Sequence, residues 1–440
     1  MPPTLPSAAG SLRVVYMTAG AGGMYCGSCM HDNTLVAALK ARGRDVTLIP
    51  LYTPVRTDEP DVSEACVLYG GINVYLQQVS PLFARLPFGL DRLLDRPGLI
   101  RGVLARAGDA GGDPKKLGPL TVSMLSGERG AQKREVRKLA QALAELRPGL
   151  VVLPDALFVG AAETLRRELR VPVCCSLTGE DLFLDKLPER YRTEADRLLS
   201  DGARNVDTFI ALTRYYADYS ARRWNIPREK IEVLPPGVRT DDVAPREESA
   251  VGSPRIAYLS RLCADKGLHL LCNAFIGLRR AGTSCRLAIG GYLGDLEKPF
   301  WEEQERKLRD AGVWEQVEYA GSPDRAGKLA LLQSADLFSV PGVYHEAKGL
   351  PLLEALAHGV PVVQPAHGSY VEIVEQTGGG LLYSADRPAA LQETLQRLID
   401  DAAGRRTLGC RGRAAVLQSF SAEAMADRAW ALFERLAGRG

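Results

Sequence analysis

The residues whose types and spacing point most directly to chemistry are two glutamates, Glu346 and Glu354, with seven residues between them. A turn at Gly349 precedes Pro351, and proline near the first position is typical of a helix start. The free N–H groups at a helix N-terminus and its positive dipole end suit a phosphate. Each carboxylate can accept a pair of sugar hydroxyls. The spacing therefore favours a ligand that carries both a sugar and a diphosphate, which is a nucleotide-sugar.

The alternative for this segment alone is an ordinary βαβ crossover with solvated glutamates. Two cations upstream favour the ligand, because Arg261 and Lys266 follow the predicted strand 255–259. Arginine offers a planar fork of donors and lysine a mobile point charge, and both suit a diphosphate. Gly22 and Gly23 also follow a predicted strand, where a glycine backbone could approach the same diphosphate, although a tight turn explains them equally well.

Composition and charge exclude several classes of protein. The 440 residues are too many for one ordinary core, so two domains are expected. The net charge of +2 gives no global indication of nucleic-acid binding. The chain has no run of about 18 apolar residues and no N-terminal pattern of a signal peptide. The nine scattered cysteines indicate a reduced, cytoplasmic protein.

Strand and helix signals alternate along both halves, which predicts an α/β protein with parallel sheets. In the first half, strands are predicted at 11–18, 45–50, 150–153, 171–177, 209–212 and 232–234, with helices at 34–42 and 161–169. The polar, proline-containing stretch 241–254 has the composition of a linker. In the second half, strands are predicted at 255–259, 285–290, 317–320, 337–340 and 360–364, with helices at 267–281, 301–311, 325–335 and 350–358.

The two halves read as Rossmann-like domains, and ligands in such sheets bind at the carboxyl ends of the strands. Facing domains would then form a cleft between them. The amphipathic segment 421–437 predicts a final helix that returns to pack on the first domain.

Two further segments have a structural and a functional interpretation. Cys26 and Cys29 form a CxxC motif, but no second CxxC and no nearby histidine pair completes a metal site, so small residues shaping a loop are the preferred interpretation. Residues 81–106 combine leucine and phenylalanine with five arginines. That segment could contact anionic lipid, although such stretches more often pack on their own domain.

Together these motifs resemble the retaining family 4 glycosyltransferases with the GT-B fold, and the resemblance covers nearly all of the chain. Its most specific part is the second-half set of Arg261, Lys266 and the motif from Glu346 to Glu354. The weaker motifs are Gly22-Gly23, Thr178-Gly179-Glu180-Asp181, Leu234-Pro235-Pro236-Gly237-Val238 and Phe420-Ser421-Ala422-Glu423-Ala424-Met425.

The resemblance implies a retaining glycosyltransferase of the hexosyltransferase type, with two Rossmann-like, doubly wound domains facing across a cleft. Residues 1–245 would bind the acceptor, residues 246–418 would bind the nucleotide-sugar, and helix 419–440 would pack back on the first domain. The donor is a substrate, and the resemblance implies neither a cofactor nor a divalent metal. The acceptor would be a glycan, a lipid or a small molecule. The location would be cytoplasmic, with peripheral membrane contact through residues 81–106 as an option.

The resemblance also assigns residue roles. Arg261 and Lys266 would hold the donor diphosphate, and Glu354 would bind the ribose hydroxyls. Glu346 would bind the hydroxyls of the transferred sugar. The implied catalytic residues are Arg261, Lys266 and Glu346, and the implied donor-binding residues are Gly22, Gly23, Arg261, Lys266, Glu346, Lys348, Gly349, Leu350 and Glu354.

Two departures from the family pattern bear on the mechanism. Lys348 stands where many members have phenylalanine, which could favour a different donor or only place a charge in solvent. The family's first-domain histidines are absent, and His31, Asp155 and Glu180 are the remaining candidates there. A nucleotide-sugar epimerase, a phosphorylase or a non-catalytic sugar-binding protein on the same scaffold are the alternative functions, since fold alone does not fix function.

Overall fold

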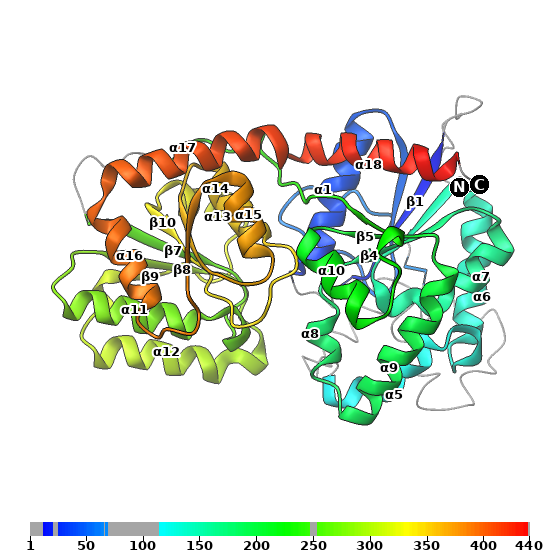
Figure 1. Cartoon of the computed structure of the whole chain (residues 1–440), viewed down its shortest axis with the longest axis horizontal. Helices are drawn as coiled ribbons and strands as arrows, with labels where there is room; N and C mark the ends of the chain where they lie inside the picture. The colour runs from blue at the N-terminus through cyan, green and yellow to red at the C-terminus, as the bar shows by residue number, and fades with distance from the viewer. Residues whose placement is uncertain (1–11, 21–24, 66, 69–113, 247–252, 439–440) are drawn as a thin grey trace. The chain divides into compact units, whose positions relative to one another are not determined.

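The structure is a computed structural model that describes residues 12–20, 25–65, 67–68, 114–246 and 253–438 (Figure 1). The chain forms two compact units, each with its own sheet. Unit 1 comprises Met1–Leu212, Tyr216–Pro235 and Met425–Gly440, and unit 2 comprises Thr213–Tyr215 and Pro236–Ala424.

The sheet of unit 1 has six parallel strands in the order β2-β1-β3-β4-β5-β6. Most positions in these strands are buried, and all four residues of β3 are. Continuous apolar runs are typical of parallel strands, because helices cover both faces of the sheet. The strands are β1 (Arg13–Thr18), β2 (Asp45–Pro50), β3 (Leu150–Leu153), β4 (Val173–Leu177), β5 (Thr208–Ala211) and β6 (Ile231–Val233).

The sheet of unit 2 also has six parallel strands, in the order β12-β11-β10-β7-β8-β9. The strands are β7 (Arg255–Leu259), β8 (Arg286–Gly290), β9 (Val317–Tyr319), β10 (Leu337–Phe338), β11 (Val362–Pro365) and β12 (Gly380–Tyr383). In each sheet the early strands are added on one side of the first strand, and the later strands are added on its other side. The predicted α/β class with two doubly wound sheets is therefore confirmed.

Helices connect the strands in both units (Figure 1). In unit 1 they include α1 (Gly27–Ala41), α5 (Pro114–Leu125), α6 (Lys133–Leu146), α7 (Val159–Leu169), α8 (Asp181–Leu184), α9 (Glu189–Gly202), and most of α10 (Arg214–Arg223) and α18 (Ala422–Ala437). In unit 2 they include α11 (Leu268–Arg280), α12 (Lys298–Asp310), α13 (Arg325–Gln333), α14 (Leu350–Ala357), α15 (Ser369–Thr377), α16 (Ala390–Asp400) and α17 (Ala402–Ser419).

The start of α1 differs from the prediction. The sequence predicts a helix at 34–42 with a loop around the two cysteines, but α1 begins at Gly27 and takes Cys26 as its N-cap. The amide of Met30 donates to the carbonyl of Cys26 at 3.0 Å, which closes the first turn. The loop interpretation of the CxxC segment is therefore wrong, because its residues already belong to the helix.

The described part of the predicted linker packs on unit 2. Within it the guanidinium of Arg246 pairs with Asp336 at 2.7 Å, and just before it Val238 forms a bridge with Ser421. The main segment of unit 2 begins at Pro236, earlier than the boundary predicted at 245–246. The last residues of the chain group with unit 1, where Asp427 of α18 pairs with Arg42 at 2.7 Å.

Three predictions concern residues outside the described part of the chain. Gly22, Gly23 and the arginine-rich segment 81–106 belong to the ranges that the structure does not describe. Within the ranges that it does describe, no helix has both the length and the apolar character needed to cross a membrane.

Candidate functional site

The candidate site lies in unit 2, where the strand order of the sheet reverses. β10 pairs in parallel with β7, while β8 continues the sheet on the other side of β7. In open parallel sheets a ligand crevice forms at this point, beyond the carboxyl ends of the strands. The loop 260–266 after β7 and the loop 339–349 after β10 carry most of the predicted site residues.

The two loops approach so closely that only glycine fits at their contact. The amide of Val343 donates to the carbonyl of Asp265 at 3.0 Å. Gly267 has a φ of 72°, and a Cβ there would lie 1.7 Å from the carbonyl oxygen of Pro341. The backbone conformation and the neighbouring loop both exclude a side chain at this position. This contact brings Lys266 next to the residues that follow β10.

Lys266, Tyr344 and Glu346 form a closed set of hydrogen bonds. The Lys266 Nζ donates to the Glu346 Oε2 at 2.7 Å and also donates to the hydroxyl of Tyr344. That hydroxyl donates in turn to the same Oε2 at 2.6 Å. The ammonium lies 4.9 Å from the centroid of the Tyr344 ring, which adds a cation–π attraction. We call these three residues the Lys266–Tyr344–Glu346 triad.

Glu346 is held in its charged form. Burial alone would raise its pKa, since the residue is only 5% exposed. The charges of Lys266 and Lys348, with the hydrogen bonds from Lys266 and Tyr344, outweigh burial and lower the pKa to about 2. The Glu346 carboxylate is therefore an acceptor only, and it can receive hydroxyl donors from a ligand.

The backbone around Glu346 is also fixed. Its carbonyl accepts a hydrogen bond from the amide of Ser369 at 2.8 Å. Gly368, with a φ of 60°, makes this approach available, because a Cβ there would lie 2.7 Å from the nitrogen of Glu346. The start of α15 therefore fixes the backbone that carries the carboxylate.

The N-terminus of α14 adjoins the triad. Gly349 caps the helix with a φ of 70°, and a Cβ there would lie 2.3 Å from the Ile373 Cδ1. The amide of Lys348 donates to the Glu346 Oε1 at 3.2 Å. Of the implied donor-binding residues Lys348, Gly349 and Leu350, the first thus donates its amide to the Glu346 carboxylate. Gly349 and Leu350 lie at the positive end of the helix dipole.

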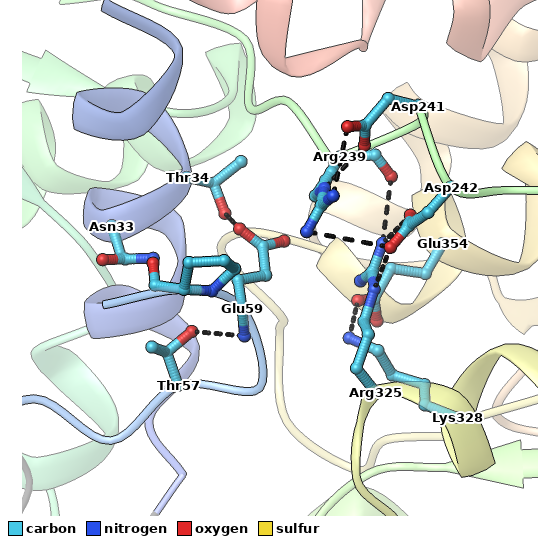
Figure 2. A network of polar contacts seen from close by, with 11 residues as sticks. Asn33, Thr34, Thr57, Glu59, Arg239, Asp241, Asp242, Arg325, Lys328 and Glu354 are labelled. Atoms are coloured by element: carbon cyan, nitrogen blue, oxygen red, sulfur yellow. Dashed lines mark hydrogen bonds and ion pairs between the residues drawn. The ribbon is translucent and has the colours of Figure 1, made fainter. Parts of the chain in front are cut away.

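Glu354 forms a second ion pair with a lysine that the sequence did not single out. Lys328 of α13 donates from Nζ to the Glu354 Oε1 at 2.5 Å, and the two side chains are only 8% and 18% exposed (Figure 2). Arg325, one turn earlier on α13, pairs with Asp242 at 2.6 Å (Figure 2). A lysine in an amphipathic helix usually points to solvent, so nothing in the local sequence indicates that Lys328 contacts a site residue. The Glu354 carboxylate is held by Lys328 of α13, whereas that of Glu346 is held by Lys266 and Tyr344.

Arg261 is the second residue of the loop after β7. Its carbonyl accepts the hydroxyl of Tyr258 at 2.9 Å, which ties the loop to the buried strand. Burial alone would lower the pKa of its guanidinium, but Cys263, Glu297 and Asp265 raise it overall. Among the described residues, no carboxylate lies within ion-pair distance of this guanidinium. Its charge is therefore available to an anionic ligand.

The three first-domain candidates are engaged within unit 1. Three backbone amides donate to the Glu180 carboxylate at 2.9–3.2 Å. Asp155 accepts from the amide of Leu157 at 2.9 Å, and burial, with the charge of Glu180, raises its pKa to about 8. His31 is buried with its Nδ1 3.3 Å from the Asp32 carboxylate. Asp155 therefore holds a proton at neutral pH, and Glu180 organises its own loop.

The two cysteines of the CxxC motif lie at the start of α1. Cys26 is half-buried at the N-cap of α1, and Cys29 is buried inside the helix. The thiol of Cys26, followed by burial, raises the pKa of Cys29 well above its ordinary value. Over the described residues, no group of three His, Cys, Asp or Glu side chains is arranged to hold a metal ion.

Two known protein families together match most of the chain. Residues 241–415 match the family described as "Glycosyl transferases group 1", and residues 33–237 match the "Glycosyl transferase 4-like domain".

Curated relatives point the same way. The chain is 30% identical over 282 residues to the GDP-mannose-dependent alpha-(1-6)-phosphatidylinositol monomannoside mannosyltransferase of Mycolicibacterium smegmatis, which covers 61% of this chain and 70% of that protein. It is 26% identical to the amylovoran biosynthesis glycosyltransferase AmsK of Erwinia amylovora over 74% of this chain and 80% of that protein. Other alignments span little more than half of the relative's length, such as 58% of the phosphatidyl-myo-inositol mannosyltransferase of Mycobacterium leprae.

Solved structures match the fold over nearly the whole chain. The sucrose-phosphate synthase of Thermosynechococcus elongatus superposes with a TM-score of 0.68 at 18% identity, covering 98% of this chain and all of that one. The Anabaena protein HepE, determined in complex with UDP and glucose, superposes with a TM-score of 0.66 at 15% identity, covering 96% of this chain and 99% of that one. At these identities the likeness shows the fold.

Proposed function

The chain belongs to the family 4 glycosyltransferases of the GT-B fold, and we propose that it moves a sugar from a nucleotide-diphosphate donor to an acceptor hydroxyl with retention of configuration. The observation that carries this proposal is the Lys266–Tyr344–Glu346 triad at the point where the sheet of unit 2 reverses its order. It combines a cation suited to a diphosphate with an ionised acceptor suited to sugar hydroxyls. The proposed donor class agrees with the GDP-mannose and UDP named for the relatives and neighbours.

The chemistry proposed for the site is electrostatic. As the bond between the sugar and the diphosphate lengthens, negative charge grows on the leaving group, and Arg261 with Lys266 would stabilise it. Glu346 would hold hydroxyls of the transferred sugar and Glu354 those of the ribose. The two cations would do the work that a divalent metal does elsewhere. The acceptor hydroxyl would attack on the face that the diphosphate leaves, which retains the configuration.

A screen of UDP-, GDP- and ADP-sugars tests the proposal. The correct donor should raise the thermal unfolding midpoint, since a ligand at 100 times its dissociation constant stabilises by about 2.7 kcal/mol. The same donor should be hydrolysed slowly in the absence of an acceptor. Lys266→Met should abolish both effects, while Lys307→Met should keep them, because Lys307 pairs with Glu303 on the solvent-facing side of α12.

The screen also separates the alternatives. A folded protein that neither binds nor hydrolyses any donor contradicts the proposal. Conversion of the donor sugar into its epimer without an acceptor would instead indicate an epimerase.

A cytoplasmic location and peripheral contact with anionic lipid through residues 81–106 belong to the same proposal. Co-sedimentation with phosphatidylglycerol vesicles, compared with phosphatidylcholine vesicles, tests the lipid contact. Replacing the arginines of this segment by glutamine should remove the difference between the two.

A further inference from the structure

The proposed function asks Lys266 and Glu346 to serve different parts of one donor, yet the two side chains neutralise each other. Their ion pair measures 2.7 Å and is largely buried, with side-chain exposures of 17% and 7%. A diphosphate competes with Glu346 for the Lys266 ammonium and therefore loosens this pair. Loosening it weakens a hydrogen bond to the buried carboxylate of Glu346, and a buried acceptor without a donor is strongly unfavourable.

Tyr344 supplies a second donor to the same oxygen. Its hydroxyl lies 2.6 Å from the Glu346 Oε2 and also accepts a hydrogen bond from Lys266. Burial, reinforced by the charge of Glu346, raises the pKa of the Tyr344 hydroxyl well above its ordinary value, so the hydroxyl keeps its proton. The donor to Oε2 is thus present whichever partner Lys266 takes.

We propose that Tyr344 is a positioning residue whose hydroxyl keeps Glu346 hydrogen-bonded while Lys266 moves from that carboxylate to the donor diphosphate. The inference rests on the proposed function of the site. Tyr344 acts through Lys266 and Glu346, and it need not touch the donor.

The proposal predicts that the two parts of the donor respond differently to loss of the hydroxyl. In Tyr344→Phe, a diphosphate that attracts Lys266 leaves the Oε2 without a donor. Binding of a ligand that contains only the diphosphate is weakened by the whole free-energy cost of this unpaired oxygen. A complete nucleotide-sugar brings hydroxyls that donate to Glu346 and offset it. A merely structural role of Tyr344 would weaken both ligands equally.

Calorimetric titration with inorganic pyrophosphate and with the nucleotide-sugar found in the screen tests this prediction. Tyr344→Phe should weaken pyrophosphate binding about tenfold but weaken the nucleotide-sugar less than about threefold. Tyr319→Phe is the matched control, because Tyr319 stacks on Trp301 through its ring at 4.3 Å and lies on β9. Equal losses for the two ligands in Tyr344→Phe would overturn the proposal.

A double-mutant cycle gives an independent readout. Glu346→Gln removes the charge that holds Lys266, so this variant should bind pyrophosphate more tightly than the wild type. The measurement does not depend on whether Tyr344→Phe folds. In that background Tyr344→Phe should change pyrophosphate binding by less than about twofold. If Glu346→Gln binds pyrophosphate no more tightly than the wild type, the inference about Tyr344 is contradicted, but the proposed function is not. A wild-type protein that binds neither pyrophosphate nor any nucleotide-sugar contradicts the proposed function as well.

Discussion

Replacing Gly267 by alanine tests whether the close contact between the two loops assembles the site. The added Cβ would lie 1.7 Å from the carbonyl oxygen of Pro341, whereas ordinary van der Waals contact is 3.4–4 Å. The opposing atom is backbone, so no side-chain rotation relieves the overlap. The loops must separate by more than about 1 Å, and this movement carries Lys266 away from the residues after β10.

Two contributions to the effect can be separated. A non-glycine residue in the left-handed conformation costs roughly 1–2 kcal/mol. Forcing extra atoms into a packed contact adds roughly 1–3 kcal/mol. Gly282 isolates the first contribution, because its φ is 85° but a Cβ there would have nothing within 4 Å. We therefore expect Gly282→Ala to show only the smaller loss of stability and Gly267→Ala to show the sum.

Urea unfolding of the full chain measures the stability difference, and donor hydrolysis measures the displacement of the site. A shift of about 1 Å in a catalytic group can lower turnover about a hundredfold, so Gly267→Ala should lose activity to that extent. Gly282→Ala should keep wild-type turnover. Equal stability and equal turnover in the two variants would refute the reasoning, because the loop contact would then have no role in placing Lys266.

Three further predictions concern single side chains. Lys328→Met should destabilise the protein by about 3 kcal/mol, because it leaves the largely buried carboxylate of Glu354 unpaired, and urea unfolding measures the loss. Arg261→Ala should lower kcat for donor hydrolysis about a hundredfold with a much smaller effect on donor affinity, since diphosphate charge grows only on departure. Burial lowers the pKa of His358 from 6.5 to about 4, so protonation favours the unfolded chain as the pH falls below 6.5. His358 should therefore account for a loss of about 2 kcal/mol between pH 7 and pH 5, and His358→Gln should remove that part of the pH dependence.

Matched variants serve as controls for two of these. Adding Glu354→Gln to Lys328→Met should restore most of the stability, because a neutral amide does not need the cation. Failure to restore it would show that Lys328 matters for packing instead. Arg309→Ala, which changes an exposed side chain of α12, should leave turnover unchanged. A larger loss of donor affinity than of kcat in Arg261→Ala would contradict its role in departure.

The sequence predicted the elements of the sheets well where strands are buried on both faces. β3 and β7 match their predicted limits, because fully buried parallel strands read as continuous apolar runs between polar loops. β12 (Gly380–Tyr383) was not predicted, since it follows directly on two glycines, which weaken a strand signal. The start of α1 was placed too late because glycine, serine and cysteine carry little helix signal.

The candidate site was predictable only in part. Lys266 and Glu346 could be named because both follow strands and have chemistry that suits one ligand. Tyr344 and Lys328 could not be assigned roles, because their importance depends on which partner a distant loop or helix presents. Residue type and spacing identify groups that bind a ligand, whereas the groups that support them emerge only from packing.

The division of the chain into interleaved segments limits how the protein can be dissected. Met425–Gly440 follow unit 2 in the chain but belong to unit 1. A stop codon placed after α17 would therefore remove buried side chains of unit 1, such as Phe433. A free-standing second half is best expressed from Pro236 onward, because a later start discards the bridge between Val238 and Ser421. A free-standing first half requires its final helix to be supplied by fusion or as a separate peptide.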